Sequence, residues 1–477
     1  MRRCCTGNGS DLVLAVAPSA GSQVATAPRT APAAVRFADI PAAFHTWLKE
    51  QGIQPGTFDS WIAKLNRETA EREERGEYEH LIYFALQSTR FTELPKIEPA
   101  LSAREFARGL SDVERQTWLA ESQLPPCARV PKAAQQRLQE LLKALRGFTD
   151  DERLLYLRQF TGAASRPLNE LTARCCQAYA ETMRFLYRKE FGPAGTPVDE
   201  KQIAALYQTR GHSTDTQIEA NFAVRELLAV LQSEQPKLKL NRVLIVGPGL
   251  DFAPRTELLD LFGPQSYQPF AVADALLSLG LADEARLRVH CVDINARVIA
   301  HLQRVSQSKS QQLSLLSGVA DKPSAPLTEE YKRYFQGFGN AIGKSAPLAV
   351  PPEFAGRLRK TLSIRPELLA KFSAARLNVI TERYEPSPGY DLIVVTNVFP
   401  YFSDVELLSG LTNLTKMLAE GGCLVHNEAR VTAPAVTQAL GLPMLHSRTF
   451  LIAAAKDGGQ STPLYDFAGI HQKKITQ

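Results

Sequence analysis

A short aliphatic run followed at once by a glycine turn constrains the fold of this chain more than any other stretch. Residues 243–246 read Val-Leu-Ile-Val, and Gly247, Pro248 and Gly249 follow directly. Such a run is typical of a buried strand, which glycine and proline end sharply. In an open parallel sheet this turn lies at the carboxyl end of the first strand, where glycine lets a ligand approach the backbone. The stretch therefore predicts a strand, a tight turn and a ligand site, with a nucleotide-type cofactor as the first hypothesis.

The second half of the chain alternates apolar runs with helical patterns. Further strands are predicted at residues 287–292, 377–381, 391–396 and 423–426, with two more candidates at 450–455 and 464–470. A capping box from Ser403 to Glu406 predicts the start of a helix. Residues 306–372 are less regular and are interpreted as an insertion. Repeated strand–helix units predict an α/β fold with a doubly wound, Rossmann-like parallel sheet, whose last strand is expected to be antiparallel.

The first half of the chain has a different texture. Residues 1–36 are rich in Ala, Pro, Ser, Thr and Gly, which predicts a disordered leader. Residues 37–200 carry helical periodicity and are predicted to form an all-helical N-terminal domain. Its helices are expected at 41–51, 57–75, 77–89, 103–121, 132–146, 150–160 and 167–191. The loop at 192–197 is expected to lead into a second domain, residues 201–477.

Composition and charge argue against several classes of protein. The net charge of +5 is small for 477 residues, and no basic stripe or nucleic-acid motif is present, so no nucleic-acid partner is expected. No apolar run reaches the roughly 20 residues that span a bilayer. A cytoplasmic location is expected, and secretion is the weaker alternative because Asp11 and the shortness of the apolar run at 12–17 disfavour a signal peptide.

Cysteine and histidine spacing indicates neither a disulfide framework nor a metal site. The seven cysteines include two adjacent pairs and no C-x-x-C, which favours reduced thiols. His80 follows Glu79 but has no second histidine at helical spacing, so no metal is expected there.

An acid at the end of the second predicted strand narrows the choice of cofactor. Asp293 stands where an acidic side chain accepts hydrogen bonds from the ribose hydroxyls of an adenosine cofactor. A dinucleotide fingerprint needs a third glycine where Phe252 stands, and Asp293 follows Gly247 by 46 positions (293 − 247) instead of roughly 20. The phosphate-binding G-x-x-x-x-G-K-[ST] motif is also missing. A cofactor without phosphates, S-adenosylmethionine (SAM), fits these residues best.

A polar segment precedes the helix that leads into the first strand. Ser213 or Asp215 is expected to cap that helix. The segment also contains Arg210, His212 and Thr216. Together with Ser213, these side chains are candidates to reach a ligand at the sheet edge.

Four stretches after the glycine turn match motifs of a known family. They are 267–273 (YQPFAVA, similar to E-P-Y-S-L/I-A), 292–295 (VDIN, similar to T-D-I-D/N), 327–335 and 390–402 (YDLIVVTNVFPYF, similar to F-D-L-I-F-C-R-N-V-L-I-Y-F). On these motifs, residues from about 210 to 430 resemble the class I SAM-dependent methyltransferases, and within that superfamily they are most similar to the catalytic domain of the chemotaxis-receptor glutamate methyltransferases. The last match is the most specific.

The resemblance implies roles for residues after the first two strands. Gly247 and Gly249 would line the cofactor turn, with Asp251 in place of the third glycine of a G-x-G-x-G turn. Asp293 would bind the ribose. Ile245 stands where these methyltransferases usually have an acid.

It also implies roles for residues after the third and fourth strands. Glu382 would contact the adenine amino group, while Asn397 and Val398 would lie along the methionine part. Tyr401 would face the substrate pocket as the candidate catalytic residue. A carboxylate acceptor is already ionised at neutral pH and needs no general base.

Three functions follow from these patterns. The first is a SAM-dependent methyltransferase whose acceptor is a protein carboxylate or a small molecule. The second is a catalytically silent methyltransferase-like module that binds SAM or a partner. The third is a nucleotide-dependent oxidoreductase, which Phe252 and the long spacing to Asp293 disfavour.

Overall fold

The computed structural model describes residues 31–192, 200–252, 260–430, 432–454 and 463–475. Its central feature is a seven-stranded sheet with the strand order β11-β12-β10-β9-β2-β3-β7. The strands are β2 Arg242–Val246, β3 Arg288–Asp293, β7 Phe372–Arg376, β9 Tyr390–Val395, β10 Leu418–His426, β11 Met444–Ala453 and β12 Leu464–Gln472. Neighbours from β10 to β7 are parallel, whereas β12 is antiparallel to β10 and β11. The predicted Rossmann-like α/β sheet and its antiparallel last strand are confirmed.

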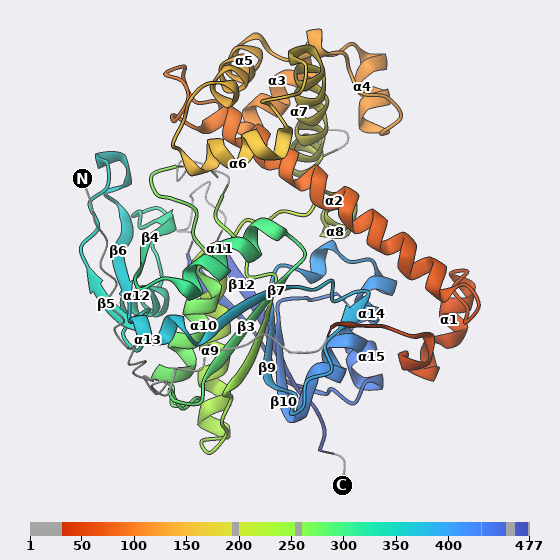
Figure 1. The fold of residues 1–477 in the computed structure, drawn as a ribbon, viewed down its shortest axis with the longest axis vertical. Helices are drawn as coiled ribbons and strands as arrows, with labels where there is room; N and C mark the ends of the chain where they lie inside the picture. Colours follow the sequence, from red (N-terminus) through yellow and green to blue (C-terminus); the bar gives the residue numbers. More distant parts are fainter. Residues whose placement is uncertain (1–30, 193–199, 253–259, 431, 455–462, 476–477) are drawn as a thin grey trace, which may run out of the picture.

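Helices cover both faces of this sheet, as its apolar strands require. Along β2, Val243 and Ile245 belong to one hydrophobic core and Leu244 and Val246 to the other, because successive side chains of a strand point to opposite faces. The covering helices are α9 Ala220–Glu234, α10 Gln268–Ser278 and α11 Ala296–Gln307 for the first core, and α14 Asp404–Met417 and α15 Thr432–Ala439 for the second (Figure 1). From the central strand β2, the chain first adds β3 and β7 on one side of the sheet and later adds β9 and β10 on the other side. The strand order therefore reverses between the neighbouring strands β2 and β9.

The third parallel strand begins earlier than its sequence indicates. Residues 377–381 were expected to form it, but β7 spans Phe372–Arg376 and pairs with β3. The apolar residues Leu377, Val379 and Ile380 are buried in the core beside α14 instead of in the ladder. The prediction was wrong because the loop after β7 contains buried apolar residues, and their sequence pattern is also that of a strand.

The expected insertion contains a small sheet of its own. Strands β4 Gln311–Ala320, β6 Arg357–Ile364 and β5 Gly343–Ala346 form a three-stranded antiparallel sheet, accompanied by α12 Glu329–Gly337 and α13 Pro366–Leu369. In Figure 1 this unit lies beside α10 and α11.

Five N-terminal helices form a bundle with the end of one long helix, α2 Phe58–Gln87, which joins the bundle to the sheet. The five are α3 Pro99–Gly109, α4 Asp112–Leu119, α5 Lys132–Arg146, α6 Glu152–Thr161 and α7 Leu168–Phe191, followed by α8 Glu200–Thr209. Helix α1 His45–Glu50 lies outside the bundle, and its Leu48 belongs to the second core of the sheet domain. Figure 1 shows α2 running from the bundle at the top to α1 beside the lower part. No helix among the described residues combines the length and apolar character of a membrane span.

Two helix boundaries differ from expectation. The predicted helices at 57–75 and 77–89 are one continuous α2, because Gly76 does not end the helix. A Cβ on Gly76 would overlap the His212 carbonyl oxygen, so glycine at this position lets the loop pack directly against the helix. The single helix predicted at 103–121 is two helices, because Ser111 forms a capping box with Glu114 and starts α4.

The first described residues pack on the sheet domain and are not part of a disordered leader. Residues 33 and 34 form β1 Ala33–Ala34, which pairs with β8 Glu382–Arg383. Val35 is buried and its amide donates to the Thr381 carbonyl oxygen at 2.9 Å. The prediction of a leader over 1–36 is therefore wrong for its last residues, while residues 1–30 lie outside the described part.

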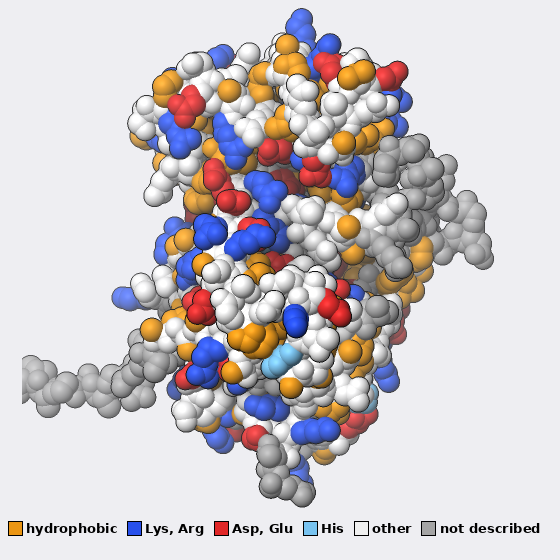
Figure 2. Space-filling model, turned by 90° about the vertical axis from the view of Figure 1, so that its right-hand side faces the viewer, with side chains coloured by type: hydrophobic (Ala, Val, Ile, Leu, Met, Phe, Trp, Pro, Cys, Tyr) orange, Lys and Arg blue, Asp and Glu red, His pale blue; other side chains and the backbone are white. Residues whose placement is uncertain are grey.

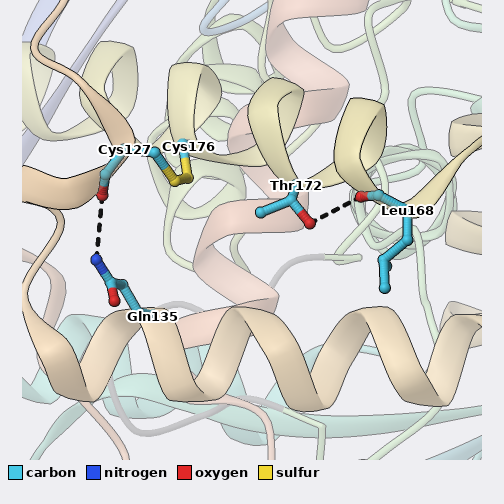
Figure 3. The surroundings of a disulfide bond; sticks show 5 residues. All are labelled: Cys127, Gln135, Leu168, Thr172 and Cys176. Atoms are coloured by element: carbon cyan, nitrogen blue, oxygen red, sulfur yellow. Dashed lines mark hydrogen bonds between the residues drawn. A yellow bond between two sulfur atoms is a disulfide. The ribbon is translucent and has the colours of Figure 1, made fainter.

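The expectation that the cysteines are reduced is wrong for one pair. Figure 3 shows the disulfide between Cys127, in a short 3₁₀ turn, and Cys176 on α7. Gln135 of α5 donates to the Cys127 carbonyl oxygen at 3.1 Å. The three free cysteines among the described residues, Cys175, Cys291 and Cys423, are buried.

Candidate functional site

A pocket lies at the carboxyl ends of the parallel strands, around the point where the chain direction reverses. Its empty volume, including space open to solvent, is about 930 Å³. The residues that follow β2, β3, β7 and β9 line it, together with α2, α9 and the loop before α9. Ligands of open α/β sheets bind at such a reversal point, so this pocket is the candidate functional site.

The glycine turn after β2 forms one wall of this pocket. Gly247 and Gly249 have positive φ angles of 63° and 74°, which side chains other than glycine rarely adopt. A Cβ on Gly247 would lie 2.5 Å from a methyl carbon of Val398, and one on Gly249 would lie 2.8 Å from the Thr214 carbonyl oxygen. The turn therefore needs glycine because two other pocket segments pack directly against it.

Asp293, the predicted ribose-binding residue, ends β3 and lines the pocket. Its Oδ1 accepts a hydrogen bond from the Asn295 amide at 2.8 Å, and its side chain is buried. Burial raises the pKa of Asp293 to about 6, although that amide and Arg297 act in the opposite direction. A ligand that donates hydrogen bonds to the carboxylate would offset this desolvation.

The segment after β9 brings Asn397, Val398 and Tyr401 to the same pocket. Asn397 has a φ of 59°, a conformation that asparagine tolerates better than most residues. It also exchanges hydrogen bonds with Asn427, whose Oδ1 accepts from the Asn397 amide at 2.8 Å and whose Nδ2 donates to the Asn397 Oδ1 at 2.7 Å. These contacts fix the backbone at the point where it turns into the pocket.

Tyr401 lies in the short 3₁₀ helix η5 Phe399–Tyr401. Its ring packs edge-on against Tyr207 and His212, at centroid distances of 5.8 and 5.6 Å. Burial raises the pKa of Tyr401, although Arg210 acts in the opposite direction. The phenol is therefore a neutral hydrogen-bonding group at physiological pH.

Two predicted cofactor residues do not line the pocket. The Asp251 carboxylate accepts from the Tyr267 hydroxyl at 2.9 Å. This hydrogen bond ties the end of the glycine turn to the residue before α10. The Glu382 carboxylate accepts from the Asn378 amide at 3.0 Å and lies in β8. Because the third strand ends five residues earlier than expected, residues 377–380 line the pocket in place of Glu382.

The polar loop before α9 covers the glycine turn. His212, Ser213 and Thr216 line the pocket, as the sequence suggested, whereas Arg210 turns away and pairs with Glu79. The expected helix cap at Ser213 or Asp215 is wrong. The helix begins at Ala220 with Glu219 before it, and the Ser213 hydroxyl donates to the Asp215 carboxylate at 2.7 Å.

Helix α2 contributes residues that the sequence did not indicate. Thr69 and Glu73, one turn apart, line the pocket beside the residues that follow β3 and β7. Burial raises the pKa of Glu73 to about 7, and the Asp293 carboxylate adds to the increase, while Arg376 opposes it. Nothing in the spacing of this helix marks these positions, because they become pocket residues only when α2 packs on the sheet edge.

Several buried polar atoms of the pocket have no hydrogen-bond partner within the described structure. They are both ring nitrogens of His212, the Asn221 Oδ1 and the Gln268 Oε1. The Asn221 amide is oriented by its Nδ2, which donates to the Gln217 carbonyl oxygen at 3.2 Å, so its Oδ1 is left as an acceptor. Burial lowers the pKa of His212 far below its usual value, with Arg72 and Arg75 adding to the effect. Such atoms are costly unless a bound ligand or water satisfies them.

The described residues include no cluster of three or more His, Cys, Asp or Glu side chains that could hold a metal ion. The polar side chains that line the pocket are carboxylates, amides, hydroxyls and the imidazole of His212.

No family model and no curated protein sequence matches the chain. Similar solved structures include the N-methyltransferase NodS from Bradyrhizobium japonicum WM9 with S-adenosyl-L-homocysteine, at 14% identity and a TM-score of 0.26, covering 53% of this chain and 87% of that one. A TehB-like SAM-dependent methyltransferase from Corynebacterium glutamicum has 11% identity and a TM-score of 0.26, covering 54% and 90%. Magnesium protoporphyrin IX methyltransferase from Synechocystis PCC 6803 with bound SAM has 9% identity and a TM-score of 0.26, covering 62% and 97%. Similarities this weak carry no argument about function. The candidate site is therefore assigned from the residues and contacts of this chain alone.

Proposed function

We propose that this protein is a SAM-dependent methyltransferase. The observation that carries the proposal is the position of the buried Asp293 carboxylate at the end of β3, in one pocket with the Gly247–Gly249 turn and with Asn397. A carboxylate at this place suits the two hydroxyls of a ribose. The resemblance of residues 210–430 to class I methyltransferases supports the same cofactor.

The pocket favours SAM over a dinucleotide. None of its described lining residues is an arginine or lysine that could pair with a diphosphate. Phe252 is buried and packs edge-on against Tyr156 at 5.1 Å, so a bulky ring fills the place of the third glycine in a dinucleotide fingerprint. The antiparallel pair of β11 and β12 at one edge of the sheet also departs from the six parallel strands of a dinucleotide-binding sheet.

When bound, SAM supplies an electrophilic methyl group on a sulfonium. We infer that Asp293 accepts from the ribose hydroxyls, while Gly247 and Gly249 leave room beside the turn. Asn397 and Val398 would then flank the methionine part. Tyr401, whose phenol is neutral, would orient the acceptor and exclude water, because methyl transfer depends chiefly on in-line positioning.

The helical N-terminal region is proposed to cap the site. Thr69 and Glu73 of α2 stand over the pocket, and the acceptor would reach it beneath this helix. The acceptor is a protein carboxylate or a small molecule. Treating the methylated product with base tests for a carboxylate acceptor, because methyl esters release methanol whereas N-methyl groups do not. Separating the product by size then distinguishes a protein from a small molecule.

Calorimetric titration with SAM and with its demethylated product tests the proposal. We expect both to bind the wild-type protein, and Asp293→Ala to weaken binding at least about tenfold through loss of charge-assisted hydrogen bonds. Asp283→Ala, which removes a partly exposed carboxylate, serves as the matched control. Binding of NAD(H) in place of SAM would overturn the proposal, and SAM binding without transfer to any acceptor would favour a silent module.

A further inference from the structure

A second cleft lies on the other side of α2 from the cofactor pocket. It is bounded by α2, α7 and the segment that follows α8, and its empty volume, including space open to solvent, is about 650 Å³. Four guanidinium groups line it, those of Arg75, Arg184, Arg188 and Arg210. Figure 2 shows charged side chains of both signs gathered where the helical bundle meets the lower part of the molecule.

One of the four arginines is fully neutralised inside the protein. Arg210 forms two hydrogen bonds with the Glu79 carboxylate, one of them from Nε to Oε2 at 2.9 Å. Both side chains are less than 10% exposed. This pair is therefore part of the wall. The charges that remain along the open space are the three guanidinium groups of Arg75, Arg184 and Arg188 and the two carboxylates of Glu121 and Glu181, which leaves one cation in excess.

Arg184 and Arg188 share a single carboxylate partner. They stand one turn apart on α7, where like charges repel, and both pair with Glu121, Arg184 at 3.9 Å. Burial lowers the pKa of Arg184, and Arg188 and Arg75 lower it further, while Glu121 and Glu181 oppose the change. The Glu121 side chain is 47% exposed, so its ion pairs are screened by water and hold little energy.

Arg75 brings a third guanidinium to the cleft from α2. It donates to the Thr209 carbonyl oxygen at 3.2 Å, and it forms no ion pair with any described carboxylate. Its charge is near enough to act on both Arg184 and His212. The open cleft thus holds a local excess of donors of the kind that bind carboxylate and phosphate oxygens in pairs.

We propose that this cleft is a binding site for a small anion, a carboxylate or phosphate group held between Arg75, Arg184 and Arg188. The site is distinct from the cofactor pocket but shares a wall with it. Gly211 borders the cleft, and the next residue, His212, borders the pocket. An anion held here would brace the loop that covers the glycine turn. This inference does not depend on the proposed methyltransferase activity.

Calorimetric titration of the full-length protein with inorganic phosphate and with malonate, at constant ionic strength, tests the site. We expect saturable binding of at least one probe, and the probe that binds identifies the oxygen chemistry. Arg184→Gln and Arg188→Gln should each weaken it about tenfold or more, as expected for the loss of a charge-assisted hydrogen bond. Arg333→Gln, which removes an arginine that is 71% exposed on α12, should bind like the wild type.

Folding of the variants is checked by their circular dichroism and by their thermal unfolding without added anion. The Arg188 side chain is 30% exposed and that of Arg184 is 17% exposed. Arg188→Gln is therefore the less disruptive substitution, and it decides the test if Arg184→Gln is destabilised. If the wild type binds neither probe saturably, or if folded Arg188→Gln binds as well as the wild type, the proposal is wrong.

Discussion

The guanidinium of Arg72 on α2 donates to the main-chain oxygen of Tyr401 at 3.0 Å, although 329 positions separate the two residues. The same side chain donates to the carbonyl oxygens of Tyr207 and Arg210 at 3.1 and 3.0 Å. One buried cation thus ties the N-terminal helix to the segment after β9 and to the loop over the pocket. Helix α2 is therefore held directly against two of the segments that line the pocket.

Replacing Arg72 with methionine should destabilise the protein and loosen Tyr401. Three part-buried carbonyl oxygens would lose a charged donor, so the free energy of unfolding should fall by about 2–4 kcal/mol, measured by urea denaturation. Arg67→Met, at an exposed position on the same helix, should change it by less than about 0.5 kcal/mol. Equal stability of the two variants would show that the Arg72 contacts contribute little.

The affinity for SAM should depend on pH through Asp293. Its pKa of about 6 in the free protein means that the carboxylate which accepts from the ribose is fully present only above that pH. Affinity should therefore be constant at higher pH and fall by up to about tenfold per unit as the pH drops below about 6. Calorimetry across this range measures it, and Asp293→Asn should remove most of the dependence.

Glu73 supplies the control for that experiment, because burial raises its pKa to about 7 in the same pocket. Glu73→Gln should leave the fall below pH 6 in place. If that fall disappears with Glu73→Gln and persists with Asp293→Asn, the ribose has been assigned to the wrong carboxylate.

Alanine at position 249 should damage both stability and cofactor binding. A Cβ there combines a φ of 74° with a distance of 2.8 Å to the Thr214 carbonyl oxygen, so the strain should be about 1–3 kcal/mol and should push the covering loop away. Gly263→Ala is the matched control, since it has open space around its Cβ. Thermal unfolding and SAM titration report the two effects, and a Gly249→Ala protein that binds SAM normally would argue against close packing of this turn.

The sequence predicted the sheet well because its strands are continuous apolar runs that end at strong breakers. Gly247, Asp293 and Asn397 follow such runs directly, and all three line the pocket. The third strand was misplaced because β7 contains small residues, Ser373 and Ala374 among them, whereas the loop after it is more apolar. That shift of five residues also explains why Glu382 does not reach the pocket.

The contributions of α2 could not be predicted in this way. Thr69 and Glu73 have polar side chains on a helix of otherwise ordinary composition, and their role arises from contacts across hundreds of residues. The open cleft on the other side of α2 likewise depends on how α7 packs against it. Periodicity in a sequence reports which face of a helix is buried, but it does not report which other segment covers that face.

The disulfide between Cys127 and Cys176 should stabilise the helical bundle under oxidising conditions. It closes a loop across 49 positions, and constraining the unfolded chain in this way typically contributes about 2–4 kcal/mol. The double variant Cys127→Ser and Cys176→Ser should therefore unfold at lower urea than the oxidised wild type, and reductant should abolish most of the difference. Cys175→Ser, at the neighbouring buried thiol, should leave the effect of reductant unchanged. Peptide mapping after alkylation without reductant gives a direct measurement, because labelled Cys127 and Cys176 would mean that the bond is absent in solution.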